Sequence, residues 1–121
     1  MNLQHPHIVR FIGLYFYVDY ADGETFERYF MATQFADNGG LDQYVEKDFG
    51  TVKLQQRLRW VRQLALALNY LHRQHFVHRD LKPQNVLLDG YWNCLVRYNF
   101  IINNTTTVFS STADCWSISL V

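Results

Sequence analysis

The sequence contains little of what marks a secreted or membrane-bound protein. Only two cysteines, Cys94 and Cys115, occur among the 121 residues, too few for a disulfide framework, and their scarcity fits a reducing cytosol. The apolar stretch from Ile8 to Val18 is interrupted by Arg10 and is too short to span a bilayer. No positively charged segment precedes it, so a signal peptide is not expected. These features favour a soluble cytoplasmic protein.

The chain also has no excess of charge of either sign. Eleven basic and eleven acidic side chains give a formal net charge of zero, so no nucleic-acid partner and no membrane partner is expected. Hydrophobic residues make up 49% and aromatic residues 17% of the sequence, which favours a globular chain over a disordered one. The length of 121 residues predicts one domain with a modest core.

The first half of the sequence predicts a hairpin followed by helices. The segments 8–18 and 28–36 are rich in β-branched and aromatic residues, and a turn signal, Ala21-Asp22-Gly23, lies between them. Residues 41–46 are expected to form a short helix. A long amphipathic helix is predicted from Thr51, as N-cap, to near His72. Its expected core stripe consists of Leu54, Leu58, Val61, Leu64, Ala65, Leu68 and Leu71.

The second half predicts shorter elements. Residues 86–88 and 94–97 are expected to form two matching strands around a turn at Asp89-Gly90. Residues 103–107 are polar and are expected to lack regular structure. Residues 113–121 form a last apolar stretch.

A polar loop between the long helix and the first short strand carries the chemistry. It reads His78-Arg79-Asp80-Leu81-Lys82-Pro83-Gln84-Asn85 and is similar, at every fixed position, to the catalytic loop of protein kinases. The chain therefore resembles a eukaryotic-type protein kinase. Lysine at position 82 resembles the serine/threonine-specific members of that family.

The resemblance implies a role for three loop residues. A hydroxyl that attacks a γ-phosphoryl group must be oriented and must lose its proton late, and Asp80 would serve as the base that does both. Lys82 would reach the transferring phosphate. Asn85 would supply an oxygen to magnesium, so the resemblance implies ATP and Mg²⁺ as cofactors and a protein as substrate.

The same resemblance implies where a nucleotide would lie. Residues 29–41 are similar to the last small-lobe strand and the hinge, with Thr33 as gatekeeper. The backbone from Gln34 to Ala36 would bond to adenine, and Leu87 would form the floor beneath it. Ala113-Asp114-Cys115-Trp116-Ser117 is similar to the start of a later buried helix, whose aspartate would brace the catalytic loop.

Departures from the family pattern predict that activity is lost. No counterpart is found for the glycine-rich loop, the phosphate-anchoring lysine or its helix glutamate. The Asp-Phe-Gly motif should fall at Tyr98-Asn99-Phe100, and none of these residues matches. A tyrosine phenol stays protonated near pKa ~10 and cannot replace a carboxylate on magnesium at neutral pH.

We therefore expect an α+β chain with a partial kinase-like fold, truncated at both ends. Residues 1–36 would be a remnant of the small lobe, 37–97 a partial large lobe, and 98–121 a degenerate segment. The expected function is that of a kinase-like fragment whose transfer of phosphate to Ser/Thr hydroxyls is lost. Two alternatives remain open: a non-catalytic, pseudokinase-type interaction module, and an active kinase completed by a partner kinase-like chain.

Several features also permit other interpretations. His72, His75 and His78 recur at every third position, which could indicate a metal site, although no carboxylate or cysteine completes a ligand set. The aromatic stretch 11–20 could form a ligand or lipid surface, but alternating spacing favours a strand that packs on a core. The arginines between Arg57 and Arg62 could bind anions or simply form a solvated helix face.

Overall fold

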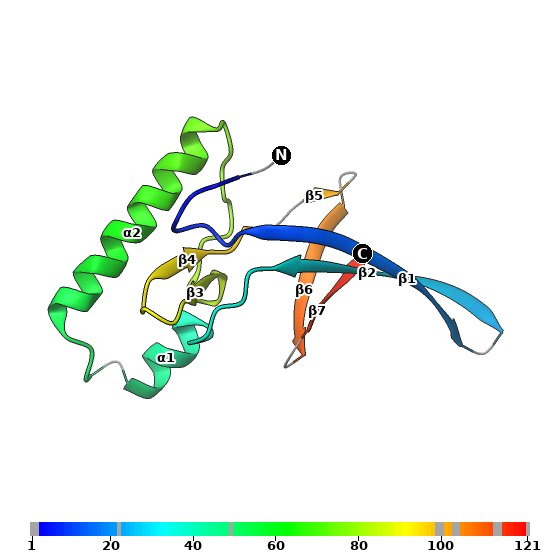
Figure 1. Cartoon of the computed structure of the whole chain (residues 1–121), viewed down its shortest axis with the longest axis horizontal. Coiled ribbons are helices and arrows are strands. Elements are labelled where there is room, and N and C mark those ends of the chain that lie inside the picture. Colours follow the sequence, from blue (N-terminus) through cyan, green and yellow to red (C-terminus); the bar gives the residue numbers. More distant parts are fainter. Residues whose placement is uncertain are drawn as a thin grey trace. The chain divides into compact units, whose positions relative to one another are not determined.

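The computed structural model describes residues 3–21, 23–48, 50–98, 101–102, 105–112 and 115–120. The chain divides into two compact units (Figure 1). Unit 1 comprises Met1–Arg10 and Phe35–Tyr98, and unit 2 comprises Phe11–Gln34 and Asn99–Val121. Helices and small antiparallel sheets occur together, which confirms the expected α+β class. Among the described residues, neither α-helix combines the length and the apolarity that a membrane crossing requires.

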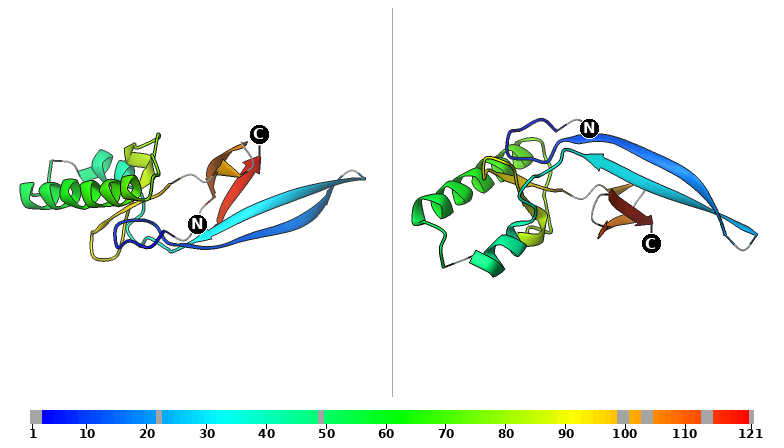
Figure 2. Two further views of the ribbon diagram at one scale, coloured as in Figure 1. Left: turned by 90° about the horizontal axis from the view of Figure 1, so that it is seen from above. Right: turned by 60° about the horizontal axis from the view of Figure 1, so that its bottom comes forward.

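Unit 1 is built around a short buried hairpin. Strand β3 (Val86–Leu88) pairs antiparallel with β4 (Cys94–Val96) in the register Val86↔Val96, and every residue of both strands is buried. Helix α2 (Leu54–Arg73) lies along this hairpin, and α1 (Leu41–Asp48) lies beside β3 (Figures 1 and 2). Ile8 adds a parallel bridge to Val96. Continuous apolar runs in both strands are what burial on both faces requires.

Helix α2 begins later than the sequence predicts. Its N-cap is Lys53, which makes no side-chain capping hydrogen bond, so the expectation that Thr51 is the cap is wrong. Arg57 instead donates from Nε to the carbonyl oxygen of Val52 at 3.0 Å, which ties the first turn to the preceding bend. The helix ends at Arg73, close to the predicted end.

The buried face of α2 also differs from the predicted one. Trp60, Gln63, Ala67 and Leu71 are buried, whereas Leu54, Leu58 and Val61 are 59–69% exposed. The predicted stripe is therefore wrong for Leu54, Leu58 and Val61, whereas Leu71 is buried and Leu64 packs against the core cluster, as predicted. The helix has two apolar faces, and a polar residue holds the buried one in place. Gln63 accepts a hydrogen bond from the backbone N–H of Cys94 at 2.9 Å and donates to Asn93 at 2.8 Å. Burying a side-chain amide costs little free energy when both its oxygen and its NH₂ group form hydrogen bonds.

Unit 2 contains the predicted hairpin within a larger sheet. Strand β1 (Phe11–Ala21) pairs antiparallel with β2 (Glu24–Thr33), and Gly23 in the turn has φ +80°, which glycine adopts without strain. Both strands lie a few residues from their predicted bounds. The sheet continues through β7 (Cys115–Leu120), β6 (Thr105–Thr112) and β5 (Ile101–Ile102), in the order β1-β2-β7-β6-β5.

Two expectations for the end of the chain are therefore wrong. Residues 105–107 belong to strand β6, although their polarity predicts no regular structure. Residues 115–120 form strand β7, not the start of a helix, and Asp114 lies outside the described residues. The run of threonine and valine at residues 105–108 explains the first outcome, because β-branched side chains favour the extended backbone, and Trp116 and Ile118 favour a strand in the second segment.

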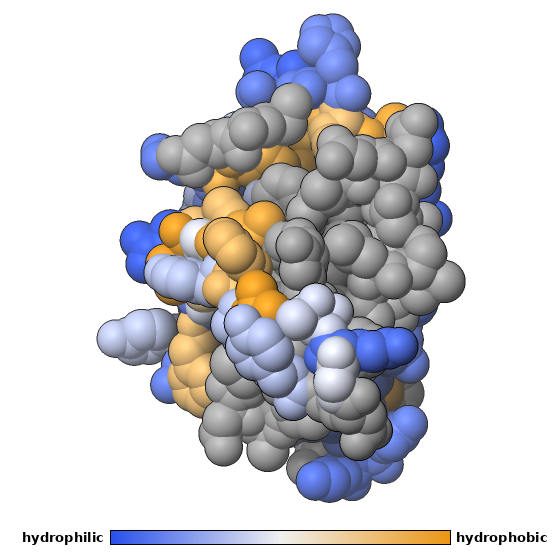
Figure 3. All heavy atoms as spheres, turned by 90° about the vertical axis from the view of Figure 1, so that its right-hand side faces the viewer, coloured by the Kyte–Doolittle hydropathy of each residue, from blue (hydrophilic) through white to orange (hydrophobic). Residues whose placement is uncertain are grey.

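Strand β1 is apolar but not packed on a core. Ile12, Leu14, Phe16 and Val18 are 41–68% exposed, so the expectation that this strand packs on a core is wrong for them. Tyr15 and Tyr17, which alternate with them, are also exposed. Hydrophobic residues reach the surface on the face drawn in Figure 3. Contiguous exposed apolar surface favours association.

The structure predicts that Leu88 contributes far more to the free energy of unfolding than Leu58 does. Leu88→Ala should lower the free energy of unfolding by about 2–5 kcal/mol, because Leu88 is 0% exposed within the cluster around Trp60. The control, Leu58→Ala on the exposed face of α2, should change it by about 0.5 kcal/mol or less. Urea unfolding followed by tryptophan fluorescence measures both. Equal costs for the two variants would contradict the described packing.

Candidate functional site: the catalytic loop

The loop that connects α2 to β3 is held by its own backbone. A short 3₁₀ turn, Pro83–Asn85, leads directly into β3, and Asn85 N–H donates to the Lys82 carbonyl oxygen at 2.8 Å. Proline suits the first position of this turn because its φ is already near the helical value. Arg79 adopts φ 60°, a left-handed conformation that reverses the chain just before Asp80.

His78 is buried and joins two backbone groups. Its Nε2 donates to the Arg97 carbonyl oxygen at 2.8 Å, and its Nδ1 accepts from the Asp80 N–H at 3.3 Å. Because a carbonyl can only accept, the short contact with Arg97 places a proton on Nε2. His78 therefore braces the loop from inside.

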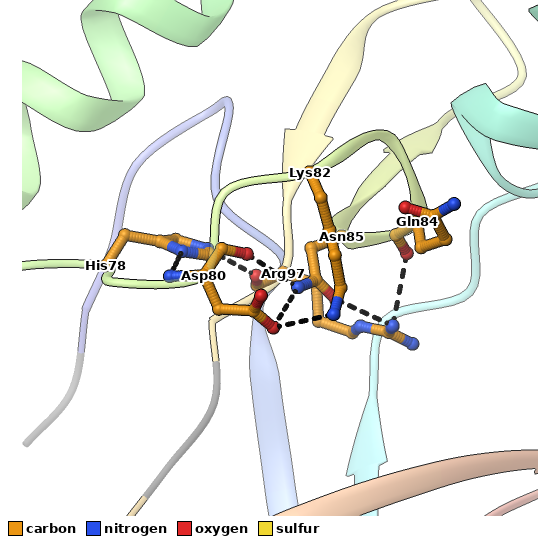
Figure 4. Close-up of polar contacts among 6 residues, drawn as sticks. All are labelled: His78, Asp80, Lys82, Gln84, Asn85 and Arg97. Atoms are coloured by element: carbon orange, nitrogen blue, oxygen red, sulfur yellow. Dashed lines mark hydrogen bonds and ion pairs between the residues drawn. The ribbon is translucent and has the colours of Figure 1, made fainter.

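The structure brings the three predicted catalytic residues together (Figure 4). Lys82 Nζ lies 3.1 Å from Asp80 Oδ2. Asn85 Nδ2 donates to the same carboxylate oxygen at 2.9 Å and to the Asp80 carbonyl oxygen at 2.8 Å. The Asp80 and Lys82 side chains are 44% and 50% exposed, so both groups are accessible to a substrate.

These neighbours keep Asp80 ionised. The hydrogen bond from Lys82 is the largest influence, and it lowers the pKa of Asp80 from the ordinary aspartate value against the opposing effect of burial. Asn85 and the charge of Lys82 add to the shift. An ionised carboxylate can accept a hydrogen bond from a substrate hydroxyl and orient it.

Arg97 is a site residue that sequence reasoning missed. Its Nη2 donates to Asn85 Oδ1 at 2.9 Å and to the Gln84 carbonyl oxygen at 3.1 Å. The sequence signal was its place one residue before the expected metal aspartate. The contact matters because it occupies the one Asn85 atom that could bind a metal.

Tyr98 is the residue at which the sequence resemblance predicts the magnesium-binding aspartate. It is 3% exposed, and its ring lies edge-on to Phe76 with centroids 5.9 Å apart. Burial raises the pKa of Tyr98 above the ordinary phenol value, and Tyr70 adds to the increase. The phenol is therefore neutral at physiological pH and is not a magnesium ligand.

The residues of this loop do not fit a magnesium ion. Magnesium prefers several hard oxygen ligands in an octahedral arrangement. Here Asn85 Oδ1 faces a guanidinium, Asp80 Oδ2 faces an ammonium, and Tyr98 is a neutral phenol. Within the described part of the chain, no group of three or more His, Cys, Asp or Glu residues could hold a metal ion.

Of the three residues implied to contact adenine, Ala36 and Leu87 lie in unit 1 and Gln34 lies in unit 2. Ala36 packs against the buried cluster of Val9, Leu87 and Leu95 in unit 1. Leu87 is 8% exposed and forms an isolated bridge with Gly40, while the Ala36 carbonyl oxygen accepts from Gly39 N–H at 3.1 Å. Gln34 is half-buried and belongs to unit 2.

Comparison with known protein families identifies the family to which this chain belongs. The family model described as protein tyrosine and serine/threonine kinase matches residues 1–102. This chain belongs to the protein kinase family. Its loop, 3₁₀ turn and paired strands are therefore kinase elements, which confirms the expected partial kinase-like fold.

Individual relatives are also kinases. The chain is 40% identical over 89 residues to the serine/threonine-protein kinase ATG1a of Arabidopsis thaliana, covering 74% of this chain and 13% of the relative. It is 37% identical over 87 residues to an Aurora kinase of Dictyostelium discoideum, covering 72% and 20%. It is 34% identical over 105 residues to the carbon catabolite-derepressing protein kinase of Saccharomyces cerevisiae, covering 87% and 15%. The chain thus spans between 13% and 20% of the length of these relatives.

The contact between Asp80 and Lys82 predicts a measurable titration. Lys82→Met should raise the pKa of Asp80 toward its ordinary value, because the largest stabilising influence on the carboxylate is removed. The lowered pKa of Asp80 stabilises the folded protein when the pH is above the pKa that Asp80 has in the unfolded chain. This stabilisation disappears as the pH falls through the pKa of Asp80 in the folded protein. Titration of the Asp80 carboxyl carbon by NMR measures the shift. Lys47→Met, in α1, is the matched control and should leave Asp80 unchanged.

Proposed function

We propose that this chain carries the catalytic loop of a serine/threonine protein kinase, and that phosphoryl transfer is impaired in it. The observation that supports the kinase assignment is the shared contact of Lys82 and Asn85 with one Asp80 carboxylate oxygen. The proposed substrates are proteins that present Ser or Thr hydroxyls, and the proposed donor is ATP. We expect an intracellular location because ATP is abundant there.

The substrate side of the loop keeps the groups that the reaction needs. A substrate hydroxyl would donate to the Asp80 carboxylate, attack the γ-phosphorus as the bond to ADP breaks, and give its proton to Asp80 late. Lys82, already beside this carboxylate, would offset negative charge on the transferring phosphoryl group. Both side chains are about half exposed, which leaves room for this approach.

The opposite side of the loop supports the proposed impairment. Asn85 Oδ1 accepts from Arg97, and Tyr98 is buried and neutral at the position of the metal aspartate. Phosphoryl transfer depends on charge stabilisation by metal ions more than on covalent chemistry. Losing two metal-binding groups should therefore lower the rate multiplicatively.

A second candidate function is a non-catalytic interaction module. Exposed aromatic side chains favour it, since Phe35 and Tyr91 are 80% and 81% exposed. This function requires no phosphoryl transfer and would tolerate an incomplete metal site. A third possibility, an active kinase completed by another kinase-like chain, would show activity only when that chain is present.

The central prediction is that the 121-residue chain transfers no phosphate above background. We expect a rate at least about a thousandfold below that of an active relative, because electrostatic losses of this kind multiply. Radiolabelled ATP and a generic basic protein substrate provide the assay. Incorporation that disappears in Asp80→Ala would overturn the proposed impairment, because a contaminating kinase would not respond to that change.

A second prediction is that Tyr98→Asp alone does not restore activity. The new carboxylate would lie at a 3% exposed position beside Phe76, where burial favours its neutral form. Arg97 would also remain on Asn85. The same radiolabel assay measures the outcome, with Tyr91→Asp at an exposed turn as the control. Turnover in Tyr98→Asp would show that this one residue accounts for the impairment.

A further inference from the structure

Arg97 is joined to the catalytic loop through both its backbone and its side chain. Its N–H donates to the Asn85 carbonyl oxygen at 2.8 Å, and its carbonyl oxygen accepts from His78 at 2.8 Å. Its guanidinium donates to Asn85 Oδ1 and to the Gln84 carbonyl oxygen. The guanidinium is therefore a cation held at a defined place, not a solvated surface group.

The orientation of the Asn85 amide depends on this cation. Asn85 Nδ2 faces two acceptors, the carbonyl and carboxylate oxygens of Asp80, while Oδ1 faces Arg97 (Figure 4). A flipped amide would place its oxygen against a carboxylate and its NH₂ group against a guanidinium, so the observed orientation is the favourable one. Oδ1 is thus committed to a fixed positive charge.

The charges around Asn85 disfavour the binding of a further cation. Asp80 already faces Lys82. Burial disfavours the charged form of Arg97, and the negative charges of Asp42 and Asp80 oppose this effect. A divalent ion at Asn85 Oδ1 would have to displace the guanidinium and would be repelled by Lys82 at Asp80 Oδ2. An arginine keeps its charge under all physiological conditions, so the arrangement does not depend on pH.

We propose that Arg97 substitutes for a divalent cation in this loop, as a positioning residue that orders Asp80 and Asn85 without metal. This inference rests on the proposed assignment of the segment as a kinase-type catalytic loop. It goes beyond impaired activity because it states what replaces the ion. The loop is then an intrinsically metal-independent structure, and the charge that orders it is part of the chain.

The test uses the whole chain and Mn²⁺ as a paramagnetic probe for the magnesium site. In the wild type, we expect no saturable broadening of the Asn85 side-chain amide signal, and amide exchange at Asp80 and Asn85 that is unchanged by Mg²⁺ or a chelator. In Arg97→Met, which keeps an unbranched stem but removes the guanidinium and its charge, those amides should exchange about tenfold faster, the effect expected from losing a hydrogen bond with a charged donor.

Two further variants make the result decisive. Arg97→Lys retains a charge and should still exclude Mn²⁺, which keeps the proposal testable if the methionine variant does not fold. Arg62→Met, on an exposed part of α2, should behave as the wild type. A saturable Mn²⁺ site at Asn85 in the wild type, or amide exchange in Arg97→Met that is no faster than in the wild type, would overturn the proposal. Neither readout requires turnover, so kinase activity in the wild type would contradict the proposed impairment and leave this test unaffected.

Discussion

The register of the β3–β4 hairpin is the constraint on which the site depends. Val86 pairs with Val96, so the residues just outside that pair, Asn85 and Arg97, must lie next to each other at the end of the ladder. The N–H of Arg97 donates to the Asn85 carbonyl oxygen there. A shift of one residue would turn every side chain of β4 to the other face and separate the two site residues.

The packing of α2 protects that register. Gln63 accepts from the backbone N–H of Cys94, and the indole of Trp60 donates to the Trp92 carbonyl oxygen at 2.8 Å. These contacts join the middle of the helix to the turn and to the first residue of β4. Asp89 completes the turn by accepting hydrogen bonds from the backbone and side chain of Asn93. Burial alone would raise the pKa of Asp89, but these hydrogen bonds lower it below the ordinary value.

The loop from His78 to Asn85 therefore has an exposed side and a partly buried side, and the two sides have different properties. On the exposed side, Asp80 and Lys82 form an accessible ion pair, where we propose that a substrate hydroxyl and a phosphoryl group would lie. On the partly buried side, Asn85 and Arg97 form a charge-assisted hydrogen bond, which is stronger than a neutral one. His78 links the two sides through the backbone of Asp80 and the carbonyl of Arg97.

The sequence by itself determined the elements that depend on local pattern. The hairpin in unit 2, the two helices, the β3–β4 pair and the loop from His78 to Asn85 could all be predicted, because turn residues, periodicity and a contiguous motif lie within short stretches of chain. The same contiguous loop carries the resemblance to protein kinases, and the family model matches residues 1–102. Only the tertiary structure decided which apolar face of α2 is buried: Trp60 is 5% exposed and Leu58 is 59% exposed, although both lie on apolar faces of the helix. It also decided that Arg97 contacts Asn85, because that contact spans twelve residues and depends on the strand register. Periodicity shows which faces can be buried, but only the partner groups in space determine which face is.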